Sequence, residues 1–195
     1  TLDVDGGTIK LDGNYPVGSG NVALGNTALD AVQSGGTYNV ALGDAAATAI
    51  TTGDNNVAVG ADALLLNTTA SNNVALGTSS VRNNTTGANN VGIGLSALYS
   101  NTTANNNTAA GFQAGYSNTT GGNNVFDGYR AGYSNTTGVS NVATGLQSFF
   151  NSTTGSYNVA IGQQALQANT TASNNTAVGY QAGYYTTTAN RLTAI

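Results

Sequence analysis

Hydrophobic and small residues recur along this chain with a period of 17 residues. Each period opens with a version of Asn-Val-Ala-Leu-Gly, in which apolar second and fourth positions alternate with a small third position, as in residues 73–77. Alternation of this kind over a short segment predicts a β-strand. The motif begins at residues 21, 39, 56, 73, 90, 107, 124, 141, 158 and 175, and a truncated unit begins at residue 192.

The other positions of the repeat, numbered from its asparagine as position 1, predict turns and a weaker second strand at positions 6–10. Glycine occupies position 5 in all ten units, which predicts a turn with positive φ or a close backbone contact. Asn-Thr-Thr followed by Gly or Ala predicts a second corner. We therefore expect an all-β fold, a parallel β-solenoid (β-roll) of about ten 17-residue coils, with a rod length of roughly 48 Å.

The alternation within each strand also leads to a prediction of its inner and outer faces. We expect the Val and Leu side chains at positions 2 and 4 to be buried: Val22, Leu24, Val40, Leu42, Val57, Val59, Val74 and Leu76. Position 3 points the other way, and it carries Ala in eight units. A strand that is apolar on both faces is usually buried on both. We therefore expect position 3 to contact another chain, the alternative being a second internal layer. The expected contacts are Ala41, Ala58, Ala75, Ala143 and Ala160.

The motif also carries a family resemblance. Residues 72–77, Asn-Asn-Val-Ala-Leu-Gly, resemble the Asn-Ser-Val-Ala-Ile-Gly motif in the heads of trimeric autotransporter adhesins, the YadA-like family. The resemblance implies a left-handed parallel β-roll, a homotrimer and a head that binds host surfaces, although the coils of that family are shorter. The repeats, together with residues 7–15 before them, also resemble fibre proteins of tailed phages.

These resemblances imply a structural and adhesive fibre segment, in first place part of a phage tail fibre used in host attachment. The alternative is the head domain of a bacterial trimeric surface adhesin. Either implies a location in the virion or at the cell surface, with other fibre or tail proteins and a host cell-surface glycan as partners. A third hypothesis, an ice-binding solenoid, is less favoured because consecutive Thr residues point to opposite faces of an extended strand.

Aromatic residues gather in one class of coil, where Gly replaces the Leu at position 9. One interpretation is that the rings refill the core and stack coil upon coil. The other is an exposed strip for sugars, because aromatic and amide groups suit pyranose rings. The candidate ligand surface comprises Phe112, Tyr116, Tyr129, Arg130, Tyr133, Tyr180 and Tyr184.

Composition narrows the possible chemistry. The chain has no His, Cys or Glu, so the usual zinc ligands, thiol nucleophiles and triad bases are absent from its sequence. Its four basic residues cannot neutralise a phosphate backbone, and no apolar run is long enough to span a bilayer. We expect no enzymatic activity, no cofactor, no metal site, no nucleic-acid binding and no membrane insertion.

The Asn-Thr-Thr corner and the two ends of the chain allow further predictions. The corner is interpreted first as a turn whose hydroxyl and amide groups satisfy the backbone and each other between coils. It also creates sequons for N-glycosylation at Asn67, Asn84, Asn101, Asn118, Asn135, Asn151 and Asn169. Residues 1–20 fall outside the repeat and are expected to form a capping or connecting hairpin before the solenoid domain of residues 21–195. The unfinished eleventh unit is interpreted as a sign that the parent protein continues.

Overall fold

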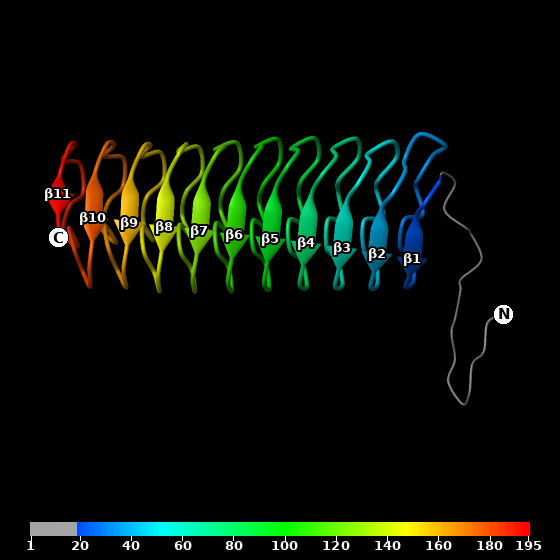
Figure 1. The fold of residues 1–195 in the computed structure, drawn as a ribbon, viewed down its shortest axis with the longest axis horizontal. Helices are drawn as coiled ribbons and strands as arrows, with labels where there is room; N and C mark the ends of the chain where they lie inside the picture. The colour runs from blue at the N-terminus through cyan, green and yellow to red at the C-terminus, as the bar shows by residue number, and fades with distance from the viewer. Residues whose placement is uncertain (1–18) are drawn as a thin grey trace, which may run out of the picture.

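The computed structural model describes residues 19–195. Its eleven short strands form one parallel sheet in sequence order, and the polypeptide winds once between each strand and the next (Figure 1). The strands are β1 (Val22–Leu24), β2 (Val40–Leu42), β3 (Val57–Val59), β4 (Val74–Leu76), β5 (Val91–Ile93), β6 (Thr108–Ala110), β7 (Val125–Asp127), β8 (Val142–Thr144), β9 (Val159–Ile161), β10 (Thr176–Val178) and β11 (Thr193–Ala194). The expected parallel β-solenoid is confirmed. The hairpin expected within residues 1–20 lies, apart from its last two residues, outside the described part.

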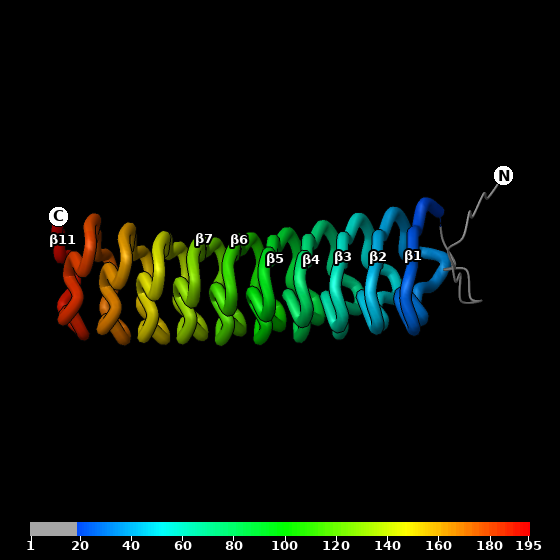
Figure 2. Tube along the Cα trace, turned by 90° about the horizontal axis from the view of Figure 1, so that it is seen from below, coloured from blue at the N-terminus to red at the C-terminus, as the bar shows by residue number. Residues whose placement is uncertain are grey.

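The register of the sheet stacks each repeat position on the same position of the next coil. Ala58 pairs with Ala75, for example, and Val59 pairs with Leu76. Figure 2 shows the coils following one another along the long axis of a rod, from β1 at one end to β11 at the other. Any side chain that recurs at a fixed repeat position therefore forms a row along this rod.

The part of each coil that follows the strand and its glycine, positions 6–11, is built from consecutive turns. Residues at positions 7 and 9 have positive φ angles, as Ser79 (55°) and Val81 (50°) show. Their amides still bond to neighbouring coils: Ser79 N–H donates to Ala61 O, and Val81 N–H donates to Ala97 O, both at 2.8 Å. The prediction of a second strand here was wrong, because alternating left-handed residues replace extended backbone while the bonding between coils is retained.

The predicted inner and outer faces of the strands were reversed. The position 3 residues Ala41, Ala58, Ala75, Ala143 and Ala160 are fully buried within the single chain. The Val and Leu residues at positions 2 and 4 point outward instead, and Val22 and Leu24 remain 49% and 42% exposed. Their assignment to the core was therefore wrong.

The core is narrow, which explains why the strand carries alanine at its inward-facing position. Position 3 faces the turn side of the coil: a Cβ atom on Gly92 would lie 2.5 Å from Cγ2 of Val81 and 2.6 Å from Oγ of Ser80. Position 9 supplies the large side chain, and Leu64 and Leu98 are fully buried. A small residue opposite a large one fills this short cross-section at close packing.

The glycine at position 5 meets both expectations from the sequence. Gly77 has a φ of +128°, a conformation that other residues rarely adopt. A Cβ atom at this residue would also lie 2.7 Å from Gly94 O in the next coil. The turn therefore needs glycine for its backbone angle and for the close stacking of coils.

Buried asparagines close the corners of the coil. At position 1, Asn73 Nδ2 donates to Gly87 O, and its Oδ1 accepts the backbone N–H of Asn90, both at 2.9 Å. At position 12, Asn84 Nδ2 donates to Asn67 Oδ1 and to Gly87 O, both at 2.8 Å. These bonds recur from coil to coil, so two internal amide ladders run along the rod.

The Asn-Thr-Thr corner is confirmed as a turn satisfied between coils. Besides the asparagine bonds, Thr85 Oγ1 donates to Thr102 O at 3.0 Å, and the same bond recurs along the row. Six of the seven sequon asparagines are fully buried, whereas Asn151 at position 11 is exposed. Glycosylation of the six is incompatible with this fold, because their amide groups lie in the ladder.

Candidate interaction surface

Six aromatic rings form two columns on the outside of the rod. At position 10, Tyr99, Tyr116, Tyr133 and Phe150 stack with ring centroids 5.1 to 5.2 Å apart and planes within 13° of parallel. At position 6, Phe112 and Tyr129 stack at 5.2 Å with an interplanar angle of 12°. The register produces these columns, since it places a ring one coil above the next wherever the position is aromatic.

Arg130 lies between the two columns. Its guanidinium carbon is 5.7 Å from the Phe112 ring centroid, 5.3 Å from that of Tyr129 and 5.4 Å from that of Tyr133. Its Nε donates to Gln113 Oε1 at 2.8 Å, which fixes the plane of the guanidinium group. These contacts are cation–π interactions, so the cation is held by three rings and one amide.

The stacking itself decides how these rings can bind a ligand. Each ring inside a column has its faces against its neighbours, so the column presents ring edges, tyrosine hydroxyls and the Arg130 guanidinium to solvent. Tyr116 and Tyr133 are half-buried, whereas Phe112 and Tyr129 are 37% and 45% exposed. A sugar that lies flat on an aromatic face would find a free face only at the ends of the columns.

The prediction that aromatic rings stack coil upon coil is thus confirmed, whereas the prediction that these rings refill the core was wrong. The core space is filled by Phe126 at position 3 and Phe149 at position 9, both fully buried. Five of the seven predicted ligand residues, Phe112 to Tyr133, do lie together on one surface.

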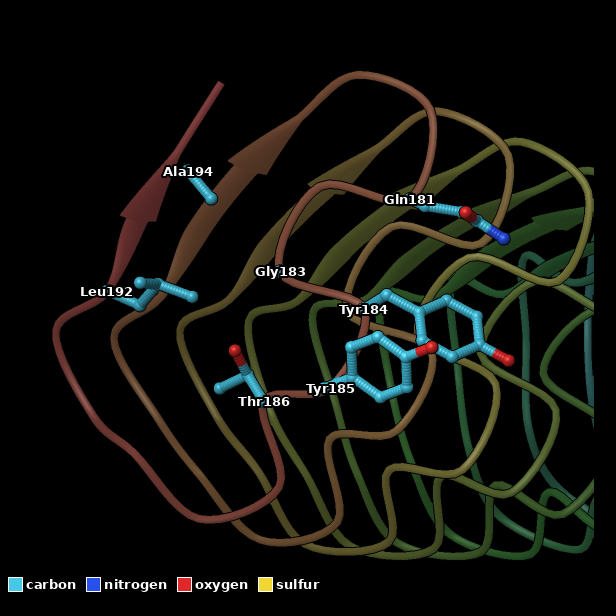
Figure 3. Close-up of a pocket in the computed structure, with 7 residues that line it drawn as sticks. All are labelled: Gln181, Gly183, Tyr184, Tyr185, Thr186, Leu192 and Ala194. Atoms are coloured by element: carbon cyan, nitrogen blue, oxygen red, sulfur yellow. The ribbon is translucent and has the colours of Figure 1, made fainter.

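The remaining two, Tyr180 and Tyr184, lie in the last coil. Tyr180 is 69% exposed, and Tyr184 is packed edge-on against Tyr185 with a centroid distance of 4.8 Å. Tyr184 and Tyr185 line an open surface pocket of about 520 Å³ together with Gln181, Gly183, Thr186, Leu192 and Ala194 (Figure 3). Figure 3 shows Leu192 and Ala194 on the side of β11 and the two tyrosines across from them.

The alanines expected at contacts between chains offer no surface for such contacts. Ala41, Ala58, Ala75, Ala143 and Ala160 belong to the chain's own core cluster, and each has 0% of its surface exposed. The internal-layer alternative holds for this face. Any contact between chains has to use other residues.

The surface that sequence reasoning missed is the outer face of the sheet with the residue just beyond its corner. We call it the outer strip: the side chains at positions 2, 4 and 6 of the ten coils. Its exposed large apolar residues are Val22, Leu24, Ile93, Leu95, Phe112, Val125, Tyr129, Leu146, Ile161, Val178 and Tyr180. The available signal was the position 3 alanine, which fits a narrow core better than it fits a surface.

Within residues 19–195, no group of three or more acidic side chains is placed to hold a metal ion. No helix in that same range has the length and apolarity needed to cross a bilayer.

Comparison with known proteins returned no relative. No family model, no curated protein and no solved structure matches this chain.

Proposed function

We propose that this chain is a rigid structural and adhesive segment of a fibre, part of a phage tail fibre used in host attachment. The observation that carries the proposal is the unbroken register of eleven strands in one sheet. Ten steps between coils at the usual strand spacing give a rod of roughly 48 Å. A fibre segment has to hold its length under load, and a rod whose strands are hydrogen-bonded to their neighbours from end to end suits that task.

Hydrogen bonds on every side of the coil support the stiffness that a fibre needs. The strand side has the sheet, the turn side has amide bonds such as Gln113 N–H to Leu95 O at 2.9 Å, and the corners have the two asparagine ladders. Bending the rod would stretch one of these rows. A rod bonded on all sides therefore resists bending in every direction.

The resemblance of the repeats to phage fibre proteins supports the assignment of this rod to a tail fibre. Arrays of this kind occur in phage fibre proteins, so the proposed partners are two further copies of the chain and neighbouring fibre or tail proteins, in the virion. The second candidate is the head of a bacterial trimeric surface adhesin, which the motif at residues 72–77 favours.

The adhesive part of the proposal concerns the aromatic columns. The ligand class that fits is a host surface glycan whose hydroxyl groups bond to the Arg130 guanidinium and the edges of Tyr116, Tyr129 and Tyr133. Each such contact is weak, and several copies on one fibre would multiply the contacts into useful avidity.

The origin of the rod can be tested with antibodies raised against it. Immunogold labelling should decorate the tail fibres of virions that carry the gene, at a fixed distance from the baseplate. Labelling on the surface of uninfected bacteria instead would favour the adhesin candidate. Labelling of neither would contradict both.

The adhesive part is tested by binding of the fluorescent chain to candidate host cells. A triple variant with Tyr116→Ala, Tyr129→Ala and Tyr133→Ala should lose most of the binding. The matched control is the triple variant Thr69→Ala, Thr86→Ala and Thr103→Ala, on the exposed row at position 14. Equal binding by the folded tyrosine variant and the parent would show that recognition does not use the columns.

A further inference from the structure

Arg130 lies in the middle of a row of side chains at position 7 that can donate hydrogen bonds. Gln113 occupies the same position one coil earlier and Gln147 one coil later, and the three residues have φ angles of 53° to 54°. Their amides bond from coil to coil: Arg130 N–H donates to Phe112 O, and Gln147 N–H donates to Tyr129 O, both at 2.9 Å. Because conformation and register are the same, the three side chains begin at equivalent points on successive coils, about 4.8 Å apart.

Aromatic and apolar residues accompany this row, and no acidic residue is among them. In the coils opening at residues 107, 124 and 141, positions 6 and 10 hold Phe112, Tyr116, Tyr129, Tyr133, Leu146 and Phe150. The acidic residue of the middle coil, Asp127, belongs to β7 and makes no ion pair with Arg130. The row therefore presents one positive charge and two amides, with tyrosine hydroxyls beside them.

The guanidinium group of Arg130 is held in place, but its terminal nitrogens are free. The ring centroids of Phe112, Tyr129 and Tyr133 lie 5.3 to 5.7 Å from its central carbon, and its Nε donates to Gln113 Oε1. Within residues 19–195, neither Nη1 nor Nη2 has a hydrogen-bond partner, and no carboxylate forms an ion pair with the group. Since the side chain is partly exposed, the edge formed by these two nitrogens is available to a ligand.

Arg82 shows the same kind of group with an acid supplied by the chain itself. Its guanidinium carbon lies 5.8 Å from the ring centroid of Tyr99, and its Nε lies 3.4 Å from Asp62 Oδ2. Its Nη1 donates to Asn83 Oδ1 at 3.2 Å. Arg130 has the rings, but an amide takes the place of the carboxylate. Its positive charge is therefore left for an acid from outside the chain.

The free edge of Arg130 fits a carboxylate better than it fits a hydroxyl group. Two parallel N–H groups of a guanidinium match the two oxygens of a carboxylate, and such charged hydrogen bonds are about twice as strong as neutral ones. One unpaired cation balances one negative charge, which favours a carboxylate over a doubly charged phosphate. The Nε2 groups of Gln113 and Gln147 have no partner among the described residues, so they can donate to neighbouring hydroxyl oxygens of the same ligand.

We propose that Arg130, together with Gln113 and Gln147, binds the carboxylate of an acidic sugar. The inference rests on the proposed function in one respect, that the ligand is a surface glycan, and it names the class of sugar and the group that is recognised. Arg130 binds the charge, and the two glutamines bind the hydroxyl groups on either side of it. The hydroxyls of Tyr129 and Tyr133 contact the rest of the sugar.

NMR titration of the isotopically labelled chain measures the dissociation constants. The probes are tetrasaccharides of galacturonate, glucuronate and mannuronate and a sialylated trisaccharide, each compared with its methyl ester, which lacks the charge but keeps every hydroxyl group. At least one acid should bind the parent about tenfold to a hundredfold more tightly than its ester. The same acid should shift the side-chain N–H signals of Arg130, Gln113 and Gln147, a readout that depends on no variant.

Three variants locate the charge that is recognised. Arg130→Gln should remove the preference for the acid over its ester. Arg130→Lys keeps the charge without the paired N–H groups, so it should lose most of the preference. The matched control is Arg82→Gln, which removes one positive charge that already has a partner and should keep the preference. Far-UV circular dichroism and melting temperatures check that each variant keeps the parent fold.

The proposal is overturned if no acid binds the parent more tightly than its ester, or if the N–H signals of Arg130 do not respond. It is equally overturned if Arg130→Lys keeps the full preference, or if Arg82→Gln abolishes it as completely as Arg130→Gln does. Tighter binding of a sulfated galactose tetrasaccharide than of every acid would show that the recognised group is not a carboxylate.

The same measurements separate this inference from the proposed function. A parent that binds acid and ester alike, while the triple tyrosine variant loses cell binding, would contradict the inference and leave the proposed function standing. A chain that prefers the acid but neither labels on fibres nor binds cells would contradict the proposed function and leave the carboxylate site standing.

Discussion

A Cβ atom on Gly132 would lie 2.2 Å from Cδ1 of Phe126, because the ring fills the space that other coils give to a leucine at position 9. On the other side of the ring, a Cβ atom on Gly115 would lie 2.6 Å from Cδ2. Phe126 is fully buried at position 3, where most coils have alanine. The large residue has moved from one side of the core to the other, and the two glycines make room for it.

This exchange predicts a compensating pair of substitutions. Gly132→Leu alone should lower the free energy of unfolding by about 1 to 3 kcal/mol, since the new side chain overlaps the Phe126 ring. Phe126→Ala alone should cost about 3 to 5 kcal/mol through the cavity it leaves. The double variant should be more stable than either single variant, because it recreates the Ala and Leu arrangement of Ala160 and Leu166.

Thermal and urea denaturation of the four proteins in this cycle measure the coupling. The backbone tolerates leucine at position 9, since Leu166 and Leu98 have φ angles of 48° and 50° there. Additive effects of the two substitutions would show that Phe126 and Gly132 do not share one packing site.

Adjacent residues of β4 test which face of the strand is inside. Ala75→Glu should be among the most damaging substitutions, with a loss of several kcal/mol, because it buries a carboxylate in the core. Leu76→Glu should reduce stability much less, because this side chain points outward and is partly exposed. Melting temperatures of the two variants under one set of conditions decide the question. Greater damage from Leu76→Glu would restore the reverse assignment of faces.

The aromatic column at position 10 predicts a modest and local stability effect. Tyr116 stacks on both Tyr99 and Tyr133, and each pair is worth about 0.5 to 1.5 kcal/mol beyond buried area. Tyr116→Leu should therefore lower the free energy of unfolding by about 1 to 3 kcal/mol. Tyr180→Leu serves as the control, since its ring is 69% exposed. Equal stability of the two variants would mean that the stacking contributes nothing measurable.

The fold could be predicted from the sequence because the repeat is short and nearly invariant. The asparagine at position 1 and the glycine at position 5 recur in every unit, and a period of 17 residues is too short for a pair of helices. The corner bonds could also be predicted, since Asn and Thr side chains commonly bond to nearby backbone. These features follow from the 17-residue period, which is visible in a single chain.

The direction of the strand faces depends on what lies across the core, which the repeat does not show. Val74 and Leu76 are large apolar residues of the kind usually found in a core. Ala75 lies between them, at a position where an exposed strand face would usually carry a polar residue. The deciding fact is that position 9, across the coil, already fills the space inside the sheet: a Cβ atom on Gly92 of β5 would lie 2.5 Å from Cγ2 of Val81. The same holds for the aromatic rings. Their stacking could be predicted from the 17-residue period, whereas their position outside the core depends on the cross-section of the coil.

One break in the position 12 ladder leads to the last prediction. Asn118 Nδ2 donates to Asn101 Oδ1 at 3.0 Å, and Asn135 Nδ2 donates to Asn118 Oδ1 at 2.8 Å. In the next coil the position holds Ser152, whose Oγ bonds toward the opposite neighbour, 3.5 Å from Asn169 Oδ1. Asn135 Oδ1 is consequently buried without a hydrogen-bond partner. Such an atom costs about 1 to 3 kcal/mol of stability.

Ser152→Asn should repair this defect and stabilise the protein. By analogy with Asn135, the new amide would donate to Asn135 Oδ1 and to Gly155 O, and its oxygen would accept from Asn169. The gain should be about 1 to 2 kcal/mol, which raises the melting temperature of a chain of this length by roughly 2 to 8 °C. Ser152→Asp is the isosteric control: it lacks the amide donors and buries a charge, so it should lower the melting temperature. If Asn and Asp shift the melting temperature alike, side-chain size rather than the amide ladder governs this site.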